Sequence, residues 1–228
     1  MAEMKLGYGS EYQLLRCLGH HRNSFYSEIL KVIDKENSDN SDIEWLDYPI
    51  DNSKDSLDGE WKDIECFKGR INDYFQIQNQ WNAFWPTKGN SQNWDGIFIY
   101  KGVWYFVEAK AHIKESIQRC SAGDESRKKI LNSFEKVTGS HDEAMNWINS
   151  KYYQLANRIA FISFCKRMNI QAKLCYILFT HGYRICPTKN NTTVEDWNKQ
   201  WEEMRKALNI PMMVLNDIYK VNIDCNNL

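Results

Sequence analysis

Residues 94–110 read WDGIFIYKGVWYFVEAK, and this stretch decides the fold. Residues 94–100 and 103–111 are rich in β-branched and aromatic side chains, which indicates two strands joined by Lys101-Gly102. A loop of two or of four residues gives the same strand register. A loop of three residues stays open, because lysine is disfavoured at a turn position with positive φ, and it would slip the register by one.

With a two-residue loop, Tyr100 pairs with Val103 and Asp95 falls directly opposite Glu108. Side chains alternate along a strand, so Lys110 lies on the same face as Glu108. Two carboxylates and one amine are therefore expected together at one end of an apolar hairpin.

Such a cluster has a chemical use. Like charges opposite each other destabilise a sheet, and a hard divalent cation such as Mg²⁺ (or Mn²⁺) resolves the conflict because it prefers oxygen ligands. The metal would polarise a phosphodiester and lower the pKa of a bound water, while Lys110 positions or deprotonates that water. The alternative is an exposed strand end with a solvated ion pair, since E-x-K triplets are common.

Asp95 and Glu108-Ala109-Lys110 resemble the motif of the PD-(D/E)xK nuclease superfamily, in which a helix, three strands, a helix and a further strand form the restriction-endonuclease-like core. Trp94 stands where the motif has proline. The resemblance implies an α/β fold with a central mixed sheet flanked by helices. It also implies that Asp95, Glu108 and the main-chain carbonyl of Ala109 bind the metal.

Further stretches resemble a bacterial subgroup of uncharacterised nuclease-like proteins, namely FWP at 84–86, Gly89, AH at 111–112, Glu115 and YQLANR at 153–158. The similarity covers about residues 10–180. In the superfamily an acid from the first helix often completes the metal site, and Glu11 is the candidate here. Its alternative role is a first-turn acid favoured by the helix dipole.

Other candidate site residues lie outside the hairpin. Gln154 and Arg158 are four apart, so they share one face of a helix; they could contact phosphate or the attacking water, or form an exposed polar face. His21 and Arg22 could bind backbone phosphate. Lys114, Arg119 and residues 127–129 could do the same, although a solvated helix face explains most of them, and His112 and Glu115 are weaker candidates.

The composition is that of an ordinary globular chain of 228 residues with net charge −1, so no overall basic field attracts nucleic acid. Seven scattered cysteines without a CxxC pair argue against a disulfide framework and a zinc cluster. Because no secretory or membrane-spanning segment is evident, we expect a cytoplasmic protein without a membrane partner. A homodimer remains open.

The remaining pattern predicts one domain over residues 1–228. Helices are expected at 10–18, 24–33, 71–84, 114–137, 142–168 (amphipathic) and 194–208, and strands at 43–50, 61–67, 173–180 and 212–223, the last at an edge, with a loop at 51–59.

These observations predict a metal-dependent nuclease that hydrolyses phosphodiester bonds of nucleic acid, with DNA as the expected substrate and RNA as the open alternative. Asp95, Glu108, Lys110, Glu11 and Gln154 would be catalytic, and Arg158, His21 and Arg22 would bind nucleic acid. One alternative is a catalytically silent binding module on the same fold. Another is an unrelated α/β protein in which the hairpin is structural.

Overall fold

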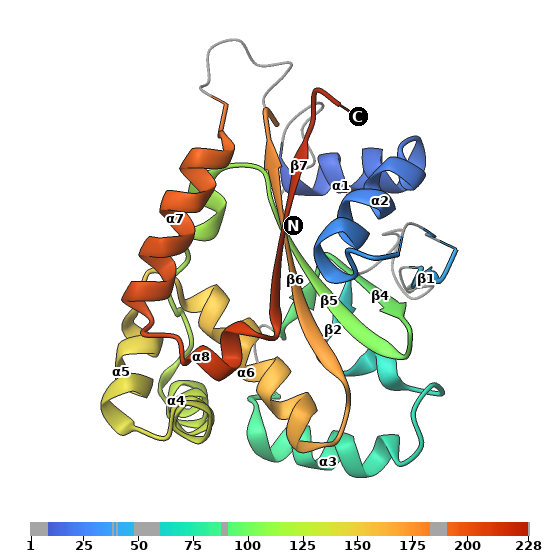
Figure 1. The fold of residues 1–228 in the computed structure, drawn as a ribbon. Helices are drawn as coiled ribbons and strands as arrows, with labels where there is room; N and C mark the ends of the chain where they lie inside the picture. The colour runs from blue at the N-terminus through green and yellow to red at the C-terminus, as the bar shows by residue number, and fades with distance from the viewer. Residues whose placement is uncertain are drawn as a thin grey trace, which may run out of the picture.

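A computed structural model describes residues 9–37, 39, 41–47, 60–87, 91–182 and 191–227. A five-stranded sheet in the order β1-β4-β5-β6-β7 lies at its centre, with helices on both faces (Figure 1). The strands of this sheet are β1 (Ile43–Trp45), β4 (Gly96–Tyr100), β5 (Val103–Lys110), β6 (Ala172–Thr180) and β7 (Ile218–Asp224). The helices are α1 (Ser10–Gly19), α2 (Arg22–Ile33), α3 (Tyr74–Phe84), α4 (Asp124–Thr138), α5 (His141–Asn149), α6 (Tyr153–Arg167), α7 (Val194–Ala207) and α8 (Met212–Leu215).

The sheet is mixed. β1, β4 and β5 are antiparallel neighbours, whereas β6 runs parallel to β5 and β7 runs parallel to β6. The predicted α/β class with a central mixed sheet between helices is therefore confirmed, and β7 is the expected edge strand. Membership of the restriction-endonuclease-like core stays a prediction. No helix within the described ranges is long and apolar enough to cross a bilayer.

The β4–β5 hairpin has the predicted register. Its pairs run from Tyr100 with Val103 to Gly96 with Val107, which rules out the three-residue loop. Lys101 and Gly102 have φ of 48° and 75°, the positive values that a type I′ turn requires. The lysine tolerates this position with help from its side chain, whose Nζ donates to Asp34 Oδ2 at 2.7 Å.

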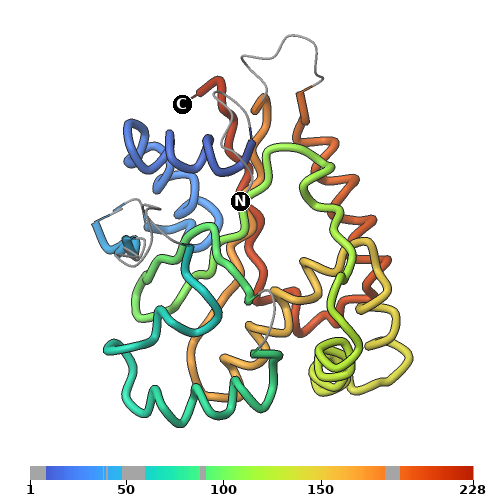
Figure 2. Tube along the Cα trace, turned by 180° about the vertical axis from the view of Figure 1, so that it is seen from behind, coloured from blue at the N-terminus to red at the C-terminus, as the bar shows by residue number. Residues whose placement is uncertain are grey.

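The two faces of the sheet bury different cores. The face that carries Val107 and Ala109 packs with α1 and α2, whereas the face that carries Trp104 and Phe106 packs with α3 to α7. Figures 1 and 2 show α1 and α2 on one side of the sheet and α4 to α7 on the other. By alternation, Glu108 lies on the face toward α6.

A tight contact fixes the start of β4. A Cβ on Gly96 would lie 2.4 Å from ring carbon Cζ2 of Trp45, so only glycine fits beneath that indole. Trp45 stacks on Phe98 with ring centroids 5.5 Å apart and also packs on Phe25 of α2. The sequence therefore uses a glycine directly after Asp95 to let an aromatic cluster close over the hairpin.

The predicted strand over residues 94–100 is two strands. Asn93–Trp94 forms β3, which pairs with β2 (Trp61–Lys62) in a separate two-stranded sheet. Asp95 lies between β3 and β4. The strand predicted over 61–67 was accordingly too long, because Asp63 adopts φ of 46° and turns the chain into the 3₁₀ helix η1 (Glu65–Phe67).

Other predicted strand and helix ends also differ. The strand predicted over 43–50 stops at Trp45, which pairs with Phe98 of β4, and residues 48–50 lie outside the described residues, as does the loop 51–59. The helix predicted from 71 begins at Tyr74, after Asp73 in the left-handed region at φ 63°. Pro211 precedes α8, which occupies the first part of the strand predicted over 212–223.

The long helix predicted over 142–168 is broken into α5 and α6. Ser150 is extended, and its Oγ accepts a hydrogen bond from the Tyr152 N–H at 3.1 Å. The break lets the Lys151 carbonyl accept from Gln118 N at 2.7 Å, and Tyr153 N donates to the Gln118 carbonyl at 3.1 Å. The same bridge keeps the chain before α4 extended, so the helix predicted from Lys114 begins only at Asp124, after a short 3₁₀ turn, η2 (Ile113–Ser116).

Candidate active site

Asp95 lies where the two-stranded sheet ends and the five-stranded sheet begins. It follows Trp94, the end of β3, and precedes β4, one residue beyond the last pair of the hairpin ladder. Its Oδ2 accepts a hydrogen bond from the Ala109 N–H at 2.7 Å. This bond fixes the Asp95 carboxylate beside the end of β5 that carries Glu108, as the predicted register requires.

Glu108 is a buried carboxylate with a cation on each side. Its side chain is 1 % exposed; Oε1 pairs with Lys110 Nζ, and Oε2 accepts from Arg158 Nε at 2.6 Å. Lys110 is itself only 6 % exposed. The alternative of an exposed strand end with a solvated ion pair therefore does not describe this site.

Arg158 reaches Glu108 from α6. Its Nη2 donates to the Asn93 carbonyl at 2.6 Å, and its guanidinium carbon lies 4.6 Å from the centroid of a Trp94 ring. The alternative that Gln154 and Arg158 form an exposed polar face is wrong for Arg158, which is buried because α6 is packed on almost all sides. These contacts hold the guanidinium in one orientation and leave some of its five N–H donors for other ligands.

The charges of this cluster act on one another. Burial, and then the charge of Glu108, raise the pKa of Asp95 to about 7, outweighing the attraction of Lys110. Burial would also raise the pKa of Glu108, but Arg158 and Lys110 bring it below its ordinary value. Burial opposes the charge of Lys110, yet Glu108 and Asp95 raise the pKa of its amine, so Lys110 is an ammonium ion at neutral pH.

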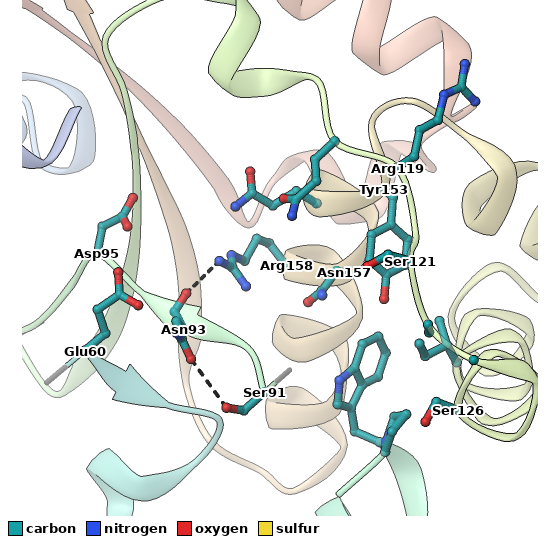
Figure 3. A pocket seen from close by; sticks show the side chains of 17 residues that line it. Glu60, Ser91, Asn93, Asp95, Arg119, Ser121, Ser126, Tyr153, Asn157 and Arg158 are labelled. Atoms are coloured by element: carbon teal, nitrogen blue, oxygen red, sulfur yellow. Dashed lines mark hydrogen bonds between the residues drawn. The ribbon is translucent and has the colours of Figure 1, made fainter. Parts of the chain in front are cut away.

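Two further acids, Glu11 and Glu60, act on each other, and only Glu60 lines a pocket together with Asp95. Glu11 lies in the first turn of α1, as predicted, and its pKa is raised by burial and then by the charge of Glu60. Glu60 precedes β2, and Figure 3 shows it on the same side of a pocket as Asp95. No sequence pattern pointed to Glu60, because it follows the polar segment 51–59 and belongs to no motif.

The pocket has a volume of about 620 Å³ and is continuous with the charged cluster. Asp95 and Arg158 both line it, whereas Glu108 and Lys110 lie behind them. Gln154 lines it too, as expected for a residue one helical turn before Arg158. Figure 3 shows Asp95 and Glu60 on one side and Ser121 on the other, with α6 contributing Arg158 between them.

Several pocket residues were not predicted. Asn157 and Tyr153 come from α6, and Asn93 and Ser91 come from the segment that leads into Asp95. The signal for Asn157 was present, since it lies three residues after Gln154 and therefore on the same face of the helix. Ser91 and Asn93 could not be found because no periodicity links them to the site.

The other candidates are placed away from the pocket or in structural contacts. His21 directly precedes α2 and Arg22 is its first residue; neither lines the pocket, and the Arg22 Nε donates to the Leu18 carbonyl at 2.9 Å. Glu115 Oε2 accepts from the Ala111 N–H at 2.7 Å and pairs with His112. Of the basic residues around α4, Arg119 lines the pocket; Arg127 bonds Asn149 on α5, and Lys129 bonds the Asn82 carbonyl on α3.

The predicted Mg²⁺ or Mn²⁺ site requires oxygen ligands at the Asp95 end of the pocket. Asp95 and Glu108 offer carboxylate oxygens of the type that Mg²⁺ and Mn²⁺ take, and the raised pKa of Asp95 shows that its carboxylate would gain from a further cation. The donor chemistry therefore fits a hard divalent ion. Within the described residues, however, no three His, Cys, Asp or Glu side chains are grouped closely enough to hold a metal ion.

Comparison of the chain with models of known protein families, with curated proteins and with solved structures gave no match.

Proposed function

We propose that this protein is a metal-dependent nuclease that hydrolyses phosphodiester bonds in nucleic acid, with DNA as the expected substrate. The observation that carries the proposal is the group formed by half-buried Asp95 and the buried Glu108, Lys110 and Arg158 beside a pocket. Two carboxylates and two fixed cations, one of each at the pocket wall and one of each behind it, are costly for a purely structural core and useful for chemistry on an anion.

Each residue has a separate role in this proposal. The ammonium of Lys110 and the guanidinium of Arg158 would offset the negative charge that develops on the phosphoryl group as water attacks phosphorus and the P–O bond to the leaving oxygen breaks. Because Lys110 is protonated at neutral pH, it would orient the water and stabilise charge; it would not remove a proton from the water. Gln154 would orient the phosphate or the water from the pocket side.

Asp95, Glu108 and the Ala109 carbonyl would hold Mg²⁺ or Mn²⁺ directly, and Glu11 would reach the ion through a water, because no three acidic side chains are grouped closely enough in the described residues to bind it together. When bound, such an ion supplies Lewis-acid polarisation of the phosphodiester and a water of lowered pKa.

One observation favours a second candidate, a nucleic-acid-binding module without catalysis. Both oxygens of Glu108 already face a cation, Lys110 on one side and Arg158 on the other, so a metal would have to compete with them. In this candidate the four charged groups stabilise the fold, and the pocket alone binds the ligand.

A cleavage assay separates the two candidates. Plasmid and labelled single- and double-stranded oligonucleotides are incubated with Mg²⁺ or Mn²⁺ and wild-type protein, Asp95→Asn, Lys110→Met, or the control Lys199→Met, an exposed lysine on α7. We expect metal-dependent cleavage by the wild type and the control, and at least a hundredfold slower cleavage by the two site variants, on the order of the loss of one transition-state contact.

Cleavage that persists at the wild-type rate in both site variants would refute the nuclease assignment. Absence of cleavage by the wild type with either ion, together with measurable binding, would favour the silent module. Circular dichroism spectra of all variants establish that lost activity does not reflect lost folding.

A further inference from the structure

We propose that the pocket is a receptor for one unpaired nucleotide next to the scissile phosphate, so that the preferred substrate is a single strand, an overhang or a frayed end and not an intact duplex. The inference rests on the proposed function, because it takes the Asp95 end of the pocket as the place of the phosphodiester. It adds the substrate class that this site accepts.

The pocket begins at the place where the phosphodiester would bind. Asp95 and Arg158 form one wall, and the cavity extends from them past Asn157 toward Ser121 and Gly123, just before α4. A phosphate held beside Arg158 would therefore carry its own nucleoside, or the next one, into the cavity. The volume of about 620 Å³ lies within the range of about 300–1,000 Å³ typical of small-molecule sites.

The lining suits a base. Tyr153 offers an aromatic ring, while Gln118, Gln154 and Asn157 offer amide groups, which can donate and accept hydrogen bonds at the edge of a base. Protein pockets for single nucleotides combine these two features, stacking on aromatic side chains and hydrogen bonds to the Watson–Crick edge. Pro86 and Ile130 add apolar surface.

One acceptor in the pocket wall lacks a bond within the described parts of the chain. Asn157 Oδ1 is buried without a hydrogen-bond partner, and an unsatisfied buried acceptor is unfavourable. An amino or imino N–H of a base would supply the missing donor. Asn157 follows Tyr153 by four residues on α6, so the amide and the proposed stacking platform share one face of the helix.

The charge distribution fits a nucleotide with its phosphate at one end. Asp95, Glu60 and Arg158 bring charged side chains to one part of the lining. Ser121, Asn157 and Tyr153 on the other side are uncharged polar groups, and Arg119, which also lines that side, directs its side chain away from Asp95 (Figure 3). A paired base cannot enter such a cavity, because it is stacked inside its duplex and must first be unpaired at a cost. An already unpaired nucleotide avoids that cost, which is the reason for the expected preference.

Binding by fluorescence anisotropy tests this directly, with Ca²⁺ in place of Mg²⁺ so that binding is measured apart from cleavage. The probes are a blunt DNA duplex and the same duplex with a single-stranded overhang. We expect the wild type to bind the overhang about tenfold more tightly, the effect of roughly one stacked base. Asn157→Leu and Ser121→Trp, which fills the pocket from an exposed loop position, should each reduce the preference to about twofold or less.

Asn132→Leu is the matched control, because Asn132 is an exposed asparagine on α4 outside the pocket, and it should keep the wild-type preference. Equal affinity of the wild type for both probes, or a preference that survives in both pocket variants, overturns the inference. If Mg²⁺-dependent cleavage is intact in that case, the nuclease proposal stands and only the pocket assignment fails. A preference for overhangs without any cleavage has the opposite meaning: the pocket assignment stands and the nuclease proposal fails.

Discussion

Arg158 on α6 donates from Nε to Glu108 Oε2 on β5 at 2.6 Å, and both side chains are less than a tenth exposed. This pair joins the helix to the central sheet at the level of the candidate site. Because Glu108 also pairs with Lys110, the carboxylate is fixed from both sides. Any reaction at this end of β5 therefore takes place beside the Glu108 carboxylate, which stays buried and ionised because Arg158 and Lys110 pair with it.

We expect Arg158→Met to destabilise the fold at neutral pH by about 3–5 kcal/mol, because it leaves Glu108 buried with one cation fewer and the Asn93 carbonyl without its donor. The pair lowers the pKa of Glu108, so its contribution is present above the ordinary pKa of a glutamate and is lost as the pH falls through the lowered value. Urea denaturation measures the loss at pH 7 and at lower pH, where we expect it to be smaller.

The matched control is Arg205→Met, which removes an exposed arginine that pairs with Glu202 on α7 at 2.8 Å. Surface pairs of this kind contribute about 0–1 kcal/mol. Equal losses for Arg158→Met and Arg205→Met would show that the Glu108 pair does not carry the stability assigned to it.

Gly96→Ala should destabilise the protein by about 1–3 kcal/mol, the usual effect of overpacking a rigid core. The new Cβ would meet an indole carbon of Trp45 at 2.4 Å, and that ring is held between Phe98 and Tyr26, so it cannot move aside freely. Thermal denaturation checks the loss. Gly123→Ala, at a glycine with no atom within 4 Å of an added Cβ, should change stability far less. An undiminished melting temperature in Gly96→Ala would refute the packing argument.

The hairpin could be predicted because its information is local. Two runs of β-branched and aromatic residues joined by Lys101-Gly102 predict the hairpin, and the register of a two-residue loop brings Asp95 to the Glu108 end of β5. The partner from α6 was harder to place: the spacing of Gln154 and Arg158 gave the helix face, but not the burial of Arg158, which depends on tertiary packing.

The break between α5 and α6 could not be predicted for a related reason. Residues 142–168 keep a helical pattern, and Ser150 gives little local signal. The break is stabilised by Gln118, which bridges to Lys151 and Tyr153 from a distant part of the chain. The same non-local bridge forms the pocket wall near Ser121, so no sequence pattern could predict the pocket either.

Asp95→Asn should stabilise the metal-free protein, and the gain should increase with pH. The folded pKa of Asp95, about 7, lies above its ordinary value, so the folded state binds this proton more tightly than the unfolded state does. The stability of the wild type therefore falls as the pH rises from about 4 to about 7. At about 1.4 kcal/mol for each pKa unit, the gain reaches on the order of 2–4 kcal/mol above pH 7 and nearly vanishes at pH 4.

Denaturation in EDTA at a series of pH values measures this difference. Asp224→Asn is the control of opposite sign: although burial opposes it, the Asn226 N–H and His181 lower the pKa of Asp224, so its loss should cost stability at neutral pH. If Asp95→Asn is less stable than the wild type at pH 8, the neighbouring cations already stabilise the ionised Asp95 carboxylate, and the argument that it would gain from a metal ion fails.

Glu108→Gln should weaken Mn²⁺ binding by on the order of tenfold or more, because it removes one of the two buried carboxylates that would hold the ion. Isothermal titration calorimetry measures this without any assumption about a substrate. Glu135→Gln, a half-buried acid on α4 that pairs with His141, is the control and should bind as the wild type does. If Glu108→Gln binds Mn²⁺ unchanged, the ion is held elsewhere, and Glu108 serves Lys110 and Arg158 as a structural counter-ion. The absence of Mn²⁺ binding in the wild type would have the same structural meaning and would favour the module without catalysis.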